Sequence, residues 1–166
     1  MIEWTEQHQM IRDVVRRFVE AEIVPHVEAL EHGDLPPYDI IRKLFSTFGM
    51  DAMARDRFER QIARDKALAA GEAVEEARDS GPRDPVEAAN ATAFQMIPII
   101  EVCRWSPGMV TAMGVSMGLT SAAILSKGTI AQKERWALPL LTFEKVGAWA
   151  ITEPGSGSDA FGSMRS

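Results

Sequence analysis

Apolar residues recur at intervals of three and four along most of this chain. In the first such stretch Ile11, Val15 and Phe18 fall on one face of a helix, while the arginines between them fall on the other. No stretch before residue 145 shows the apolar–polar alternation that is typical of a half-buried strand. These patterns predict an all-α helical bundle over residues 1–143.

Proline, glycine and hydroxyl side chains mark the expected ends of these helices. Pro25 should kink or end the first helix, because a proline lacks the N–H group that continues the hydrogen-bond ladder. Gly49 is the expected stop of the second helix. Ser106 followed by Pro107 is a typical helix start, and Gly128 is a typical finish.

Residues 51–85 are rich in charge and alanine and carry only a thin apolar stripe that includes Phe58 and Ile62. Opposite charges stand four positions apart, as in Arg55 with Glu59 and Asp56 with Arg60, and such pairs support a solvated helix. We therefore expect a charged helical insertion on the surface of the bundle. A partner-binding surface is the alternative.

The uncharged stretch from Trp105 to Ser126 is long enough to span a membrane, and Gly114 and Gly118 form a pair that can dimerise membrane helices. Its proline, serines and threonines make it only moderately apolar, and its neighbours are amphipathic. We expect the central helix of a bundle here, with no membrane span.

Composition excludes several classes of function for the 166 residues. Hydrophobic residues make up 46% of the chain, which is normal for a globular protein with a core. A formal net charge of −6 argues against nucleic acid as a partner, because phosphate binding needs a basic surface. The N-terminus is neither an apolar signal peptide nor a basic transit peptide, so a cytoplasmic protein is expected.

The cysteine and the histidines do not predict a reactive centre. Cys103 is the single cysteine, and its apolar surroundings predict a buried thiol. His8, His26 and His32 are scattered without metal-ligand spacing, so no metal site is predicted and all three are expected to be exposed.

The pattern changes at "KVGAWAIT", which predicts a short buried strand, and then at "TEPGSGSD", which predicts a sharp turn. Gly155 and Gly157 permit positive φ and leave the backbone open to a ligand. Exposed N–H groups in such a turn bind anions, and the hydroxyls and Trp149 suit a polar ring, so the segment fits a dinucleotide. An ordinary glycine-rich turn that closes a hairpin is equally compatible with these residues, whereas a Rossmann fingerprint lacks its acidic partner further on.

The stretch "GAWAITEPGSGSDA" closely resembles the signature of the acyl-CoA dehydrogenases, in which Thr-Glu-Pro-Gly-x-Gly-Ser-Asp follows a short strand. The preceding "ILSKGTIAQKERWALPLLTFEKV" is similar to the helix that leads into that strand. The resemblance is specific over residues 109–162 and covers residues 1–50 only in layout. It implies a helical N-terminal domain over 1–143 and the start of a truncated middle β-domain over 144–166.

The resemblance also implies that this segment binds FAD. The backbone of Trp149 and Ile151 and the hydroxyl of Thr152 would meet the flavin ring, and Gly157 and Ser158 the pyrophosphate. Ser158 would also touch the acyl-CoA substrate. Asp159 is expected to fix the turn. The implied cofactor-binding residues are Trp149, Ala150, Ile151, Thr152, Glu153, Pro154, Gly155, Ser156, Gly157 and Ser158.

The implied reaction is α,β-dehydrogenation of an acyl-CoA thioester, in which a carboxylate removes the α-proton and the β-hydrogen leaves as hydride to the flavin. Electrons would pass to an electron-transfer flavoprotein, and the enzyme would be a tetramer or dimer. The family's base is a glutamate of a C-terminal domain that this sequence does not contain, so no catalytic residue is assigned here. We expect an N-terminal fragment that is inactive alone; the alternative is a non-catalytic partner subunit or assembly module of a longer flavoprotein.

Overall fold

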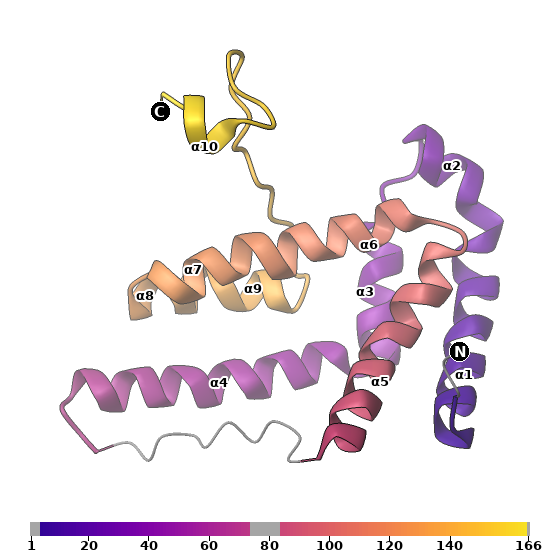
Figure 1. The fold of residues 1–166 in the computed structure, drawn as a ribbon, viewed down its shortest axis with the longest axis horizontal. Coiled ribbons are helices and arrows are strands. Elements are labelled where there is room, and N and C mark those ends of the chain that lie inside the picture. The colour runs from indigo at the N-terminus through magenta and orange to yellow at the C-terminus, as the bar shows by residue number, and fades with distance from the viewer. Residues whose placement is uncertain (1–3, 74–83, 166) are drawn as a thin grey trace.

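The computed structural model describes residues 4–73 and 84–165. Helices dominate both ranges, and within them the β pairing consists of one isolated bridge between Glu153 and Ser156. The prediction of an all-α chain is confirmed. Figure 1 shows an upright group of helices at one end, two roughly parallel layers extending from it, and a C-terminal segment that projects from the body.

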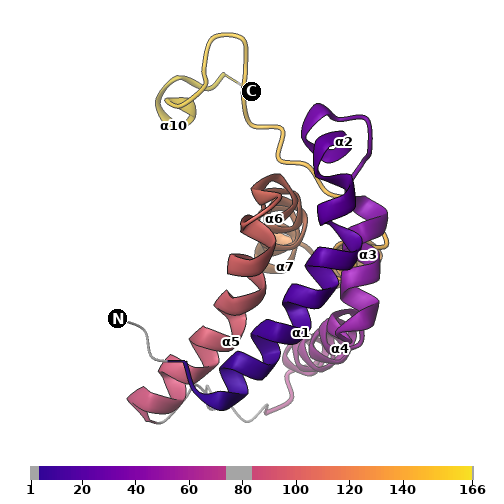
Figure 2. The same ribbon diagram turned by 90° about the vertical axis from the view of Figure 1, so that its right-hand side faces the viewer.

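The upright group comprises α1 (Glu6–Glu22), α2 (Val27–His32), α3 (Tyr38–Thr47) and α5 (Pro85–Cys103), with a 3₁₀ turn, Val24–His26, before α2. Figure 2 shows α1 and α5 side by side. Their facing sides, together with α3, bury the main apolar core, which stabilises this group by removing large side chains from water. The buried members are Val15, Val19, Ile23, Ile41, Phe45, Val102, Met109 and Phe143.

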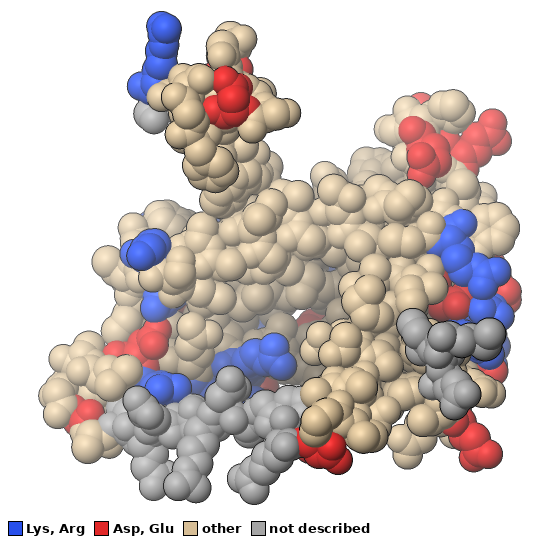
Figure 3. Space-filling view, viewed as in Figure 1, with Lys and Arg blue, Asp and Glu red and all other residues tan. Residues whose placement is uncertain are grey.

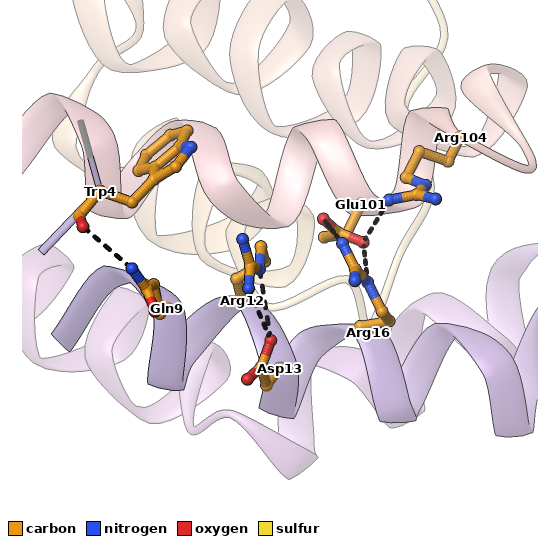
Figure 4. A network of polar contacts seen from close by, with 7 residues as sticks. All are labelled: Trp4, Gln9, Arg12, Asp13, Arg16, Glu101 and Arg104. Atoms are coloured by element: carbon orange, nitrogen blue, oxygen red, sulfur yellow. Dashed lines mark hydrogen bonds and ion pairs between the residues drawn. The ribbon is translucent and has the colours of Figure 1, made fainter. Parts of the chain in front are cut away.

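An ion pair in the same interface ties α1 to α5 (Figure 4). Arg16 donates two hydrogen bonds of 2.9 Å to the two carboxylate oxygens of Glu101, and Arg104 lies 3.7 Å from the same carboxylate. The Glu101 side chain is only 4% exposed. The hydrogen bonds from Arg16 lower the pKa of Glu101, and they outweigh the opposing effect of its burial.

His8 is buried, so its predicted exposure is wrong. The ring Nδ1 of His8 accepts a hydrogen bond from the backbone N–H of Thr5 at 3.2 Å. The backbone N–H of His8 donates to the Thr5 hydroxyl at 3.3 Å, so the two residues cap the start of α1 together. Its ring packs edge-on against Trp4 and Phe94, at centroid distances of 5.7 and 4.6 Å. The histidine is therefore buried because it caps α1 and because its ring packs against α5.

The upper layer in Figure 1 is one continuous rod, Pro107–Lys127, followed by a shorter return. The rod consists of α6 (Pro107–Met113), a π-helix (Gly114–Thr120) and α7 (Ser121–Lys127). The return consists of α8 (Ile130–Gln132), a second π-helix (Lys133–Ala137) and α9 (Leu138–Leu141).

The rod is not the buried central helix that its sequence predicts. Only 17% of its most apolar window is buried, and Figure 3 shows that the face turned to the viewer carries almost no charge. The rod is long and apolar enough to cross a bilayer, with a mean hydropathy of 1.5. One helix of this kind does not establish a membrane span, because core helices of globular proteins reach the same length and hydropathy.

The lower layer is α4 (Met50–Ala69), the helix predicted to be a surface insertion. Phe58 and Ile62 are buried against Ala137 and its apolar neighbours, and they form a second core between the layers. Three ion pairs join the same layers: Arg55 with Glu144 at 2.9 Å, and Asp65 with Lys133 and Lys66 with Glu134, both at 2.7 Å. The helix is therefore docked, even though its sequence is mostly charged.

The details of the charged segment differ in part from the prediction. Asp56 pairs with Arg60 at 2.5 Å as expected. Arg55 reaches across to the other layer, and α4 ends at Ala69 with Gly71 at φ +77° shortly after it. Residues 74–83 of the predicted insertion lie outside the described residues.

The helix ends follow the proline and glycine signals. The helix α1 ends before Pro25, Gly49 adopts φ +65° between α3 and α4, and Gly128 directly follows α7. Ser106 precedes α6 as predicted, although its side chain makes no capping hydrogen bond. Cys103 is exposed, which corrects the predicted buried thiol: it is the last residue of α5, on a face that no described element covers.

Candidate functional site

The predicted strand is not formed in the structure. Residues 146–152 belong to no strand, and Val146 and Trp149 are 39% and 45% exposed. A buried strand needs a neighbouring strand to receive its backbone hydrogen bonds, and the described residues contain none. The segment therefore crosses the rod and projects from the helical body without a sheet around it (Figures 1 and 2).

The predicted turn is present and is closed by its own backbone. The Glu153 N–H donates to the Ser156 carbonyl at 2.9 Å, and the Ser156 N–H donates to the Glu153 carbonyl at 3.1 Å. Glu153 also accepts the backbone N–H of Arg165 at 2.9 Å. The turn and the end of the chain thus form one small unit.

Asp159 fixes this unit, as predicted. Its carboxylate accepts the Gly157 N–H at 3.2 Å and the Ser163 hydroxyl at 2.6 Å, at the start of the short helix α10 (Ala160–Ser163). The hydrogen bond from Ser163 lowers the pKa of Asp159, and its own backbone N–H and that of Gly157 lower it further. This carboxylate is committed to the turn and is unsuited to act as a base.

The two glycines do not need positive φ, which corrects one reason given for them. Neither Gly155 nor Gly157 has a left-handed φ, and a Cβ on either would meet nothing within 4 Å. What they provide is open space beside the backbone. A ligand can approach the main chain at these positions without displacing a side chain.

Several hydrogen-bonding groups of the turn are not used. Within the described residues, the backbone N–H groups of Thr152, Gly155 and Ser158 donate no hydrogen bond, and the hydroxyls of Thr152 and Ser158 make none either. The Ser156 hydroxyl oxygen is buried without a partner. Unpaired donors in an open turn suit phosphate oxygens or ring carbonyls, so the residues present fit a dinucleotide.

Trp149 is the aromatic residue of the site. The residue is 45% exposed, so its ring is accessible to a flat ligand. The ten predicted cofactor residues lie together because they are consecutive in the sequence. In the described ranges, no group of three or more His, Cys, Asp or Glu side chains could hold a metal ion.

The sequence reasoning missed the residues that hold this segment to the helical body. Ser116 and Arg42 bind the backbone of Gly147 and Phe143, respectively. Both contacts join residues far apart in the chain, so no local spacing could reveal them. The single local signal was Gly147, which stands just before the aromatic residue of the site.

Comparison with known proteins supports a family assignment. The profile of the acyl-CoA dehydrogenase N-terminal domain matches residues 5–54. The short-chain specific acyl-CoA dehydrogenase, mitochondrial, of Rattus norvegicus is 29% identical to this chain over 159 residues. These residues are 96% of this chain and 32% of that protein. The 3-(aryl)acrylate reductase of Clostridium sporogenes is 28% identical to this chain over 157 residues, which are 95% of this chain and 34% of that protein.

A probable acyl-CoA dehydrogenase of Bacillus subtilis is 25% identical over 160 residues, which are 96% of this chain and 22% of that protein. The chain therefore spans about a third or less of the length of these curated relatives. No solved structure matches the chain significantly.

Proposed function

Because the chain belongs to the acyl-CoA dehydrogenase family, we propose that it forms the N-terminal, FAD-binding part of an oxidoreductase that dehydrogenates an acyl-CoA thioester between its α- and β-carbons. The observation that carries this proposal is the open turn that follows Ile151, in which the N–H groups of Thr152, Gly155 and Ser158 and the hydroxyls of Thr152 and Ser158 make no hydrogen bond within the described residues. These residues are exposed, so a ligand can reach the donors by displacing water, and accessible donors in a turn favour an anionic ligand.

Each part of the segment has a proposed task. Trp149 and Ile151 would line the ring system, and the Thr152 hydroxyl would donate to it. The N–H groups around Gly157 and the Ser158 hydroxyl would hold the pyrophosphate, as donors in open turns do. When bound, FAD supplies the hydride acceptor; the residues of this chain bind it, orient it and keep one of its faces from water.

Other parts of the proposed enzyme lie beyond these residues. No carboxylate of this chain is assigned as the base: Asp159 is held by the turn and Glu101 by Arg16. We further propose Ser158 as a contact to the acyl-CoA, an electron-transfer flavoprotein as the electron acceptor, and a homo-oligomeric enzyme in the cytoplasm.

A titration of the purified chain with FAD tests the proposal. We expect saturable binding by calorimetry, together with a shift of the visible flavin bands from those of free FAD. Gly157→Val should weaken binding at least tenfold, because the new side chain fills the open space beside the pyrophosphate donors.

Gly162→Val is the matched control. It makes the same substitution at an equally open glycine of the same segment, outside the proposed cofactor residues, and should leave the affinity unchanged. Absence of saturable binding, or equal weakening by both variants, would contradict the proposed role of the turn.

A further inference from the structure

We infer that residues 143–147 form a two-point anchor that sets the position of the cofactor segment, and that Arg42, Ser116 and Thr120 of the helical body are its positioning residues. The inference rests on the proposed function for what the segment binds. The anchor itself rests on contacts within the chain.

The first anchor point is Phe143. It is the non-glycine residue with a left-handed backbone among the described residues, at φ +60°, and it is fully buried. A bulky residue in this region is strained and persists only where its surroundings impose it. Here the ring packs between Tyr38 and Phe45, at centroid distances of 6.5 and 5.5 Å.

Arg42 fixes the same point through the backbone. Its Nε donates to the Phe143 carbonyl at 3.1 Å, while its Nη1 is held by Asp39 at 2.7 Å. The next residue, Glu144, pairs with Arg55 of α4 at 2.9 Å. Helices α3 and α4 therefore both hold the chain where it turns out of α9.

The second anchor point is Gly147. Its N–H donates to the hydroxyl oxygen of Ser116 at 3.0 Å, and Ser116 is completely buried. A Cβ at residue 147 would lie 2.9 Å from Cβ, Cγ2 and Oγ1 of Thr120, a distance that real contacts do not allow. Glycine is thus required here by the close approach of the rod, although its φ is ordinary.

The rod is distorted where it makes this contact. Ser116 and Thr120 both belong to the π-helical stretch Gly114–Thr120, and the Thr120 hydroxyl donates to the Val115 carbonyl at 3.0 Å. Such stretches are rare and are frequently found at functional sites. Here the π-turn places a buried hydroxyl and a close-packed threonine under the departing chain.

The consequence is a fixed direction for the site. Beyond Gly147 the segment projects from the body, as Figures 1 and 2 show. Two held points on either side of a short link define both where the segment begins and which way it leaves. A cofactor segment positioned in advance binds more tightly, because less ordering is needed on binding.

The test compares Gly147→Ala with Gly118→Ala, a substitution in the same π-helix where a Cβ meets nothing within 4 Å. Amide hydrogen exchange, thermal unfolding and FAD affinity are measured on each chain. For Gly147→Ala we expect at least tenfold faster exchange of the residue 147 amide, which Ser116 holds in the wild type, and at least tenfold weaker FAD binding, with the thermal midpoint of the helical body unchanged. Gly118→Ala should match the wild type in exchange and affinity.

A second variant tests whether the effects of Gly147→Ala come from its contact with Thr120 or from general destabilisation of the chain. Thr120→Gly removes the three atoms that the new Cβ meets, so it should restore exchange protection and affinity to Gly147→Ala. Unchanged exchange in Gly147→Ala, or no rescue by Thr120→Gly, would overturn the anchor. If the wild type binds no FAD, the proposed function fails, and the exchange data still show whether the anchor exists. If Gly147→Ala binds FAD as the wild type does, only the role of the anchor in positioning the segment fails.

Discussion

The helical body and the C-terminal segment differ in how far their apolar side chains are buried and their polar groups are paired. In the body, large side chains such as Phe45 and Ile23 are fully buried, and a carboxylate as deep as Glu101 has its charge matched. In the segment, Trp149 is half exposed, Phe161 is 95% exposed, and backbone donors stand unpaired. Among the described residues of the body, the ring Nε2 of His8 is the buried side-chain atom left without a partner, whereas the segment leaves several exposed backbone donors unpaired, which is what a ligand-binding element requires.

The largest expected contrast is in stability. Phe45→Ala should lower the free energy of unfolding by about 3–5 kcal/mol, because it opens a cavity in the main core. Trp149→Ala should change it by less than about 0.5 kcal/mol, because the half-exposed ring supports no core. Urea unfolding followed by circular dichroism measures both. Similar losses for the two variants would mean that the segment is part of the folding core.

The α1–α5 ion pair should be the next most sensitive point of the body. Arg16→Met removes both hydrogen bonds to Glu101 and leaves that buried carboxylate without its main partner, at a cost of about 2–4 kcal/mol. The double variant with Glu101→Gln should recover part of the loss, since it removes the buried charge. A thermodynamic cycle over the four chains would contradict this account if the two substitutions were additive.

The same pair predicts how stability depends on pH. The folded pKa of Glu101 lies below its ordinary value of 4.5, so the folded state binds its proton less readily than the unfolded chain does. The stabilisation is therefore complete well above pH 4.5 and is lost as the pH falls through the lower, folded value. Unfolding measured from pH 7 to pH 3 should show a smaller acid loss in Glu101→Gln than in the wild type.

Asp159→Asn should have the smallest effect on stability and a clear local one. The carboxylate is exposed and holds only the turn, through Gly157 and Ser163. We expect an unchanged thermal midpoint, faster amide exchange at Gly157, and weaker FAD binding. Ser46→Ala, at an exposed position of α3, is the control and should change none of the three.

The sequence predicted best what depends on neighbours along the chain. Helix ends at Gly49 and Gly128, the start at Ser106, and the turn held by Asp159 all follow from local backbone chemistry. The predicted exposure of His8 and the predicted burial of Cys103 are both wrong, because the exposure of each side chain depends on what α5 packs against. Local patterns do not contain that information.

The docking of α4 shows the same limit more clearly. Its thin apolar stripe was visible, but Phe58 and Ile62 become a core only because Ala137 lies opposite them. Likewise, the need for glycine at residue 147 comes from Thr120 on a distant part of the chain. The strand predicted over "KVGAWAIT" was wrong for the structure of this chain, since an apolar run becomes a strand only beside another strand.

Amide hydrogen exchange along the whole chain, with and without FAD, shows directly whether the turn at residues 152–158 binds the cofactor. If the turn binds FAD, the cofactor should slow exchange at residues 149–158 and leave the core positions of α1, α3 and α5 unchanged. Protection confined to the helical body, for example in the α1–α5 interface, would contradict binding at the turn, as would binding of FAD without any protection of the turn.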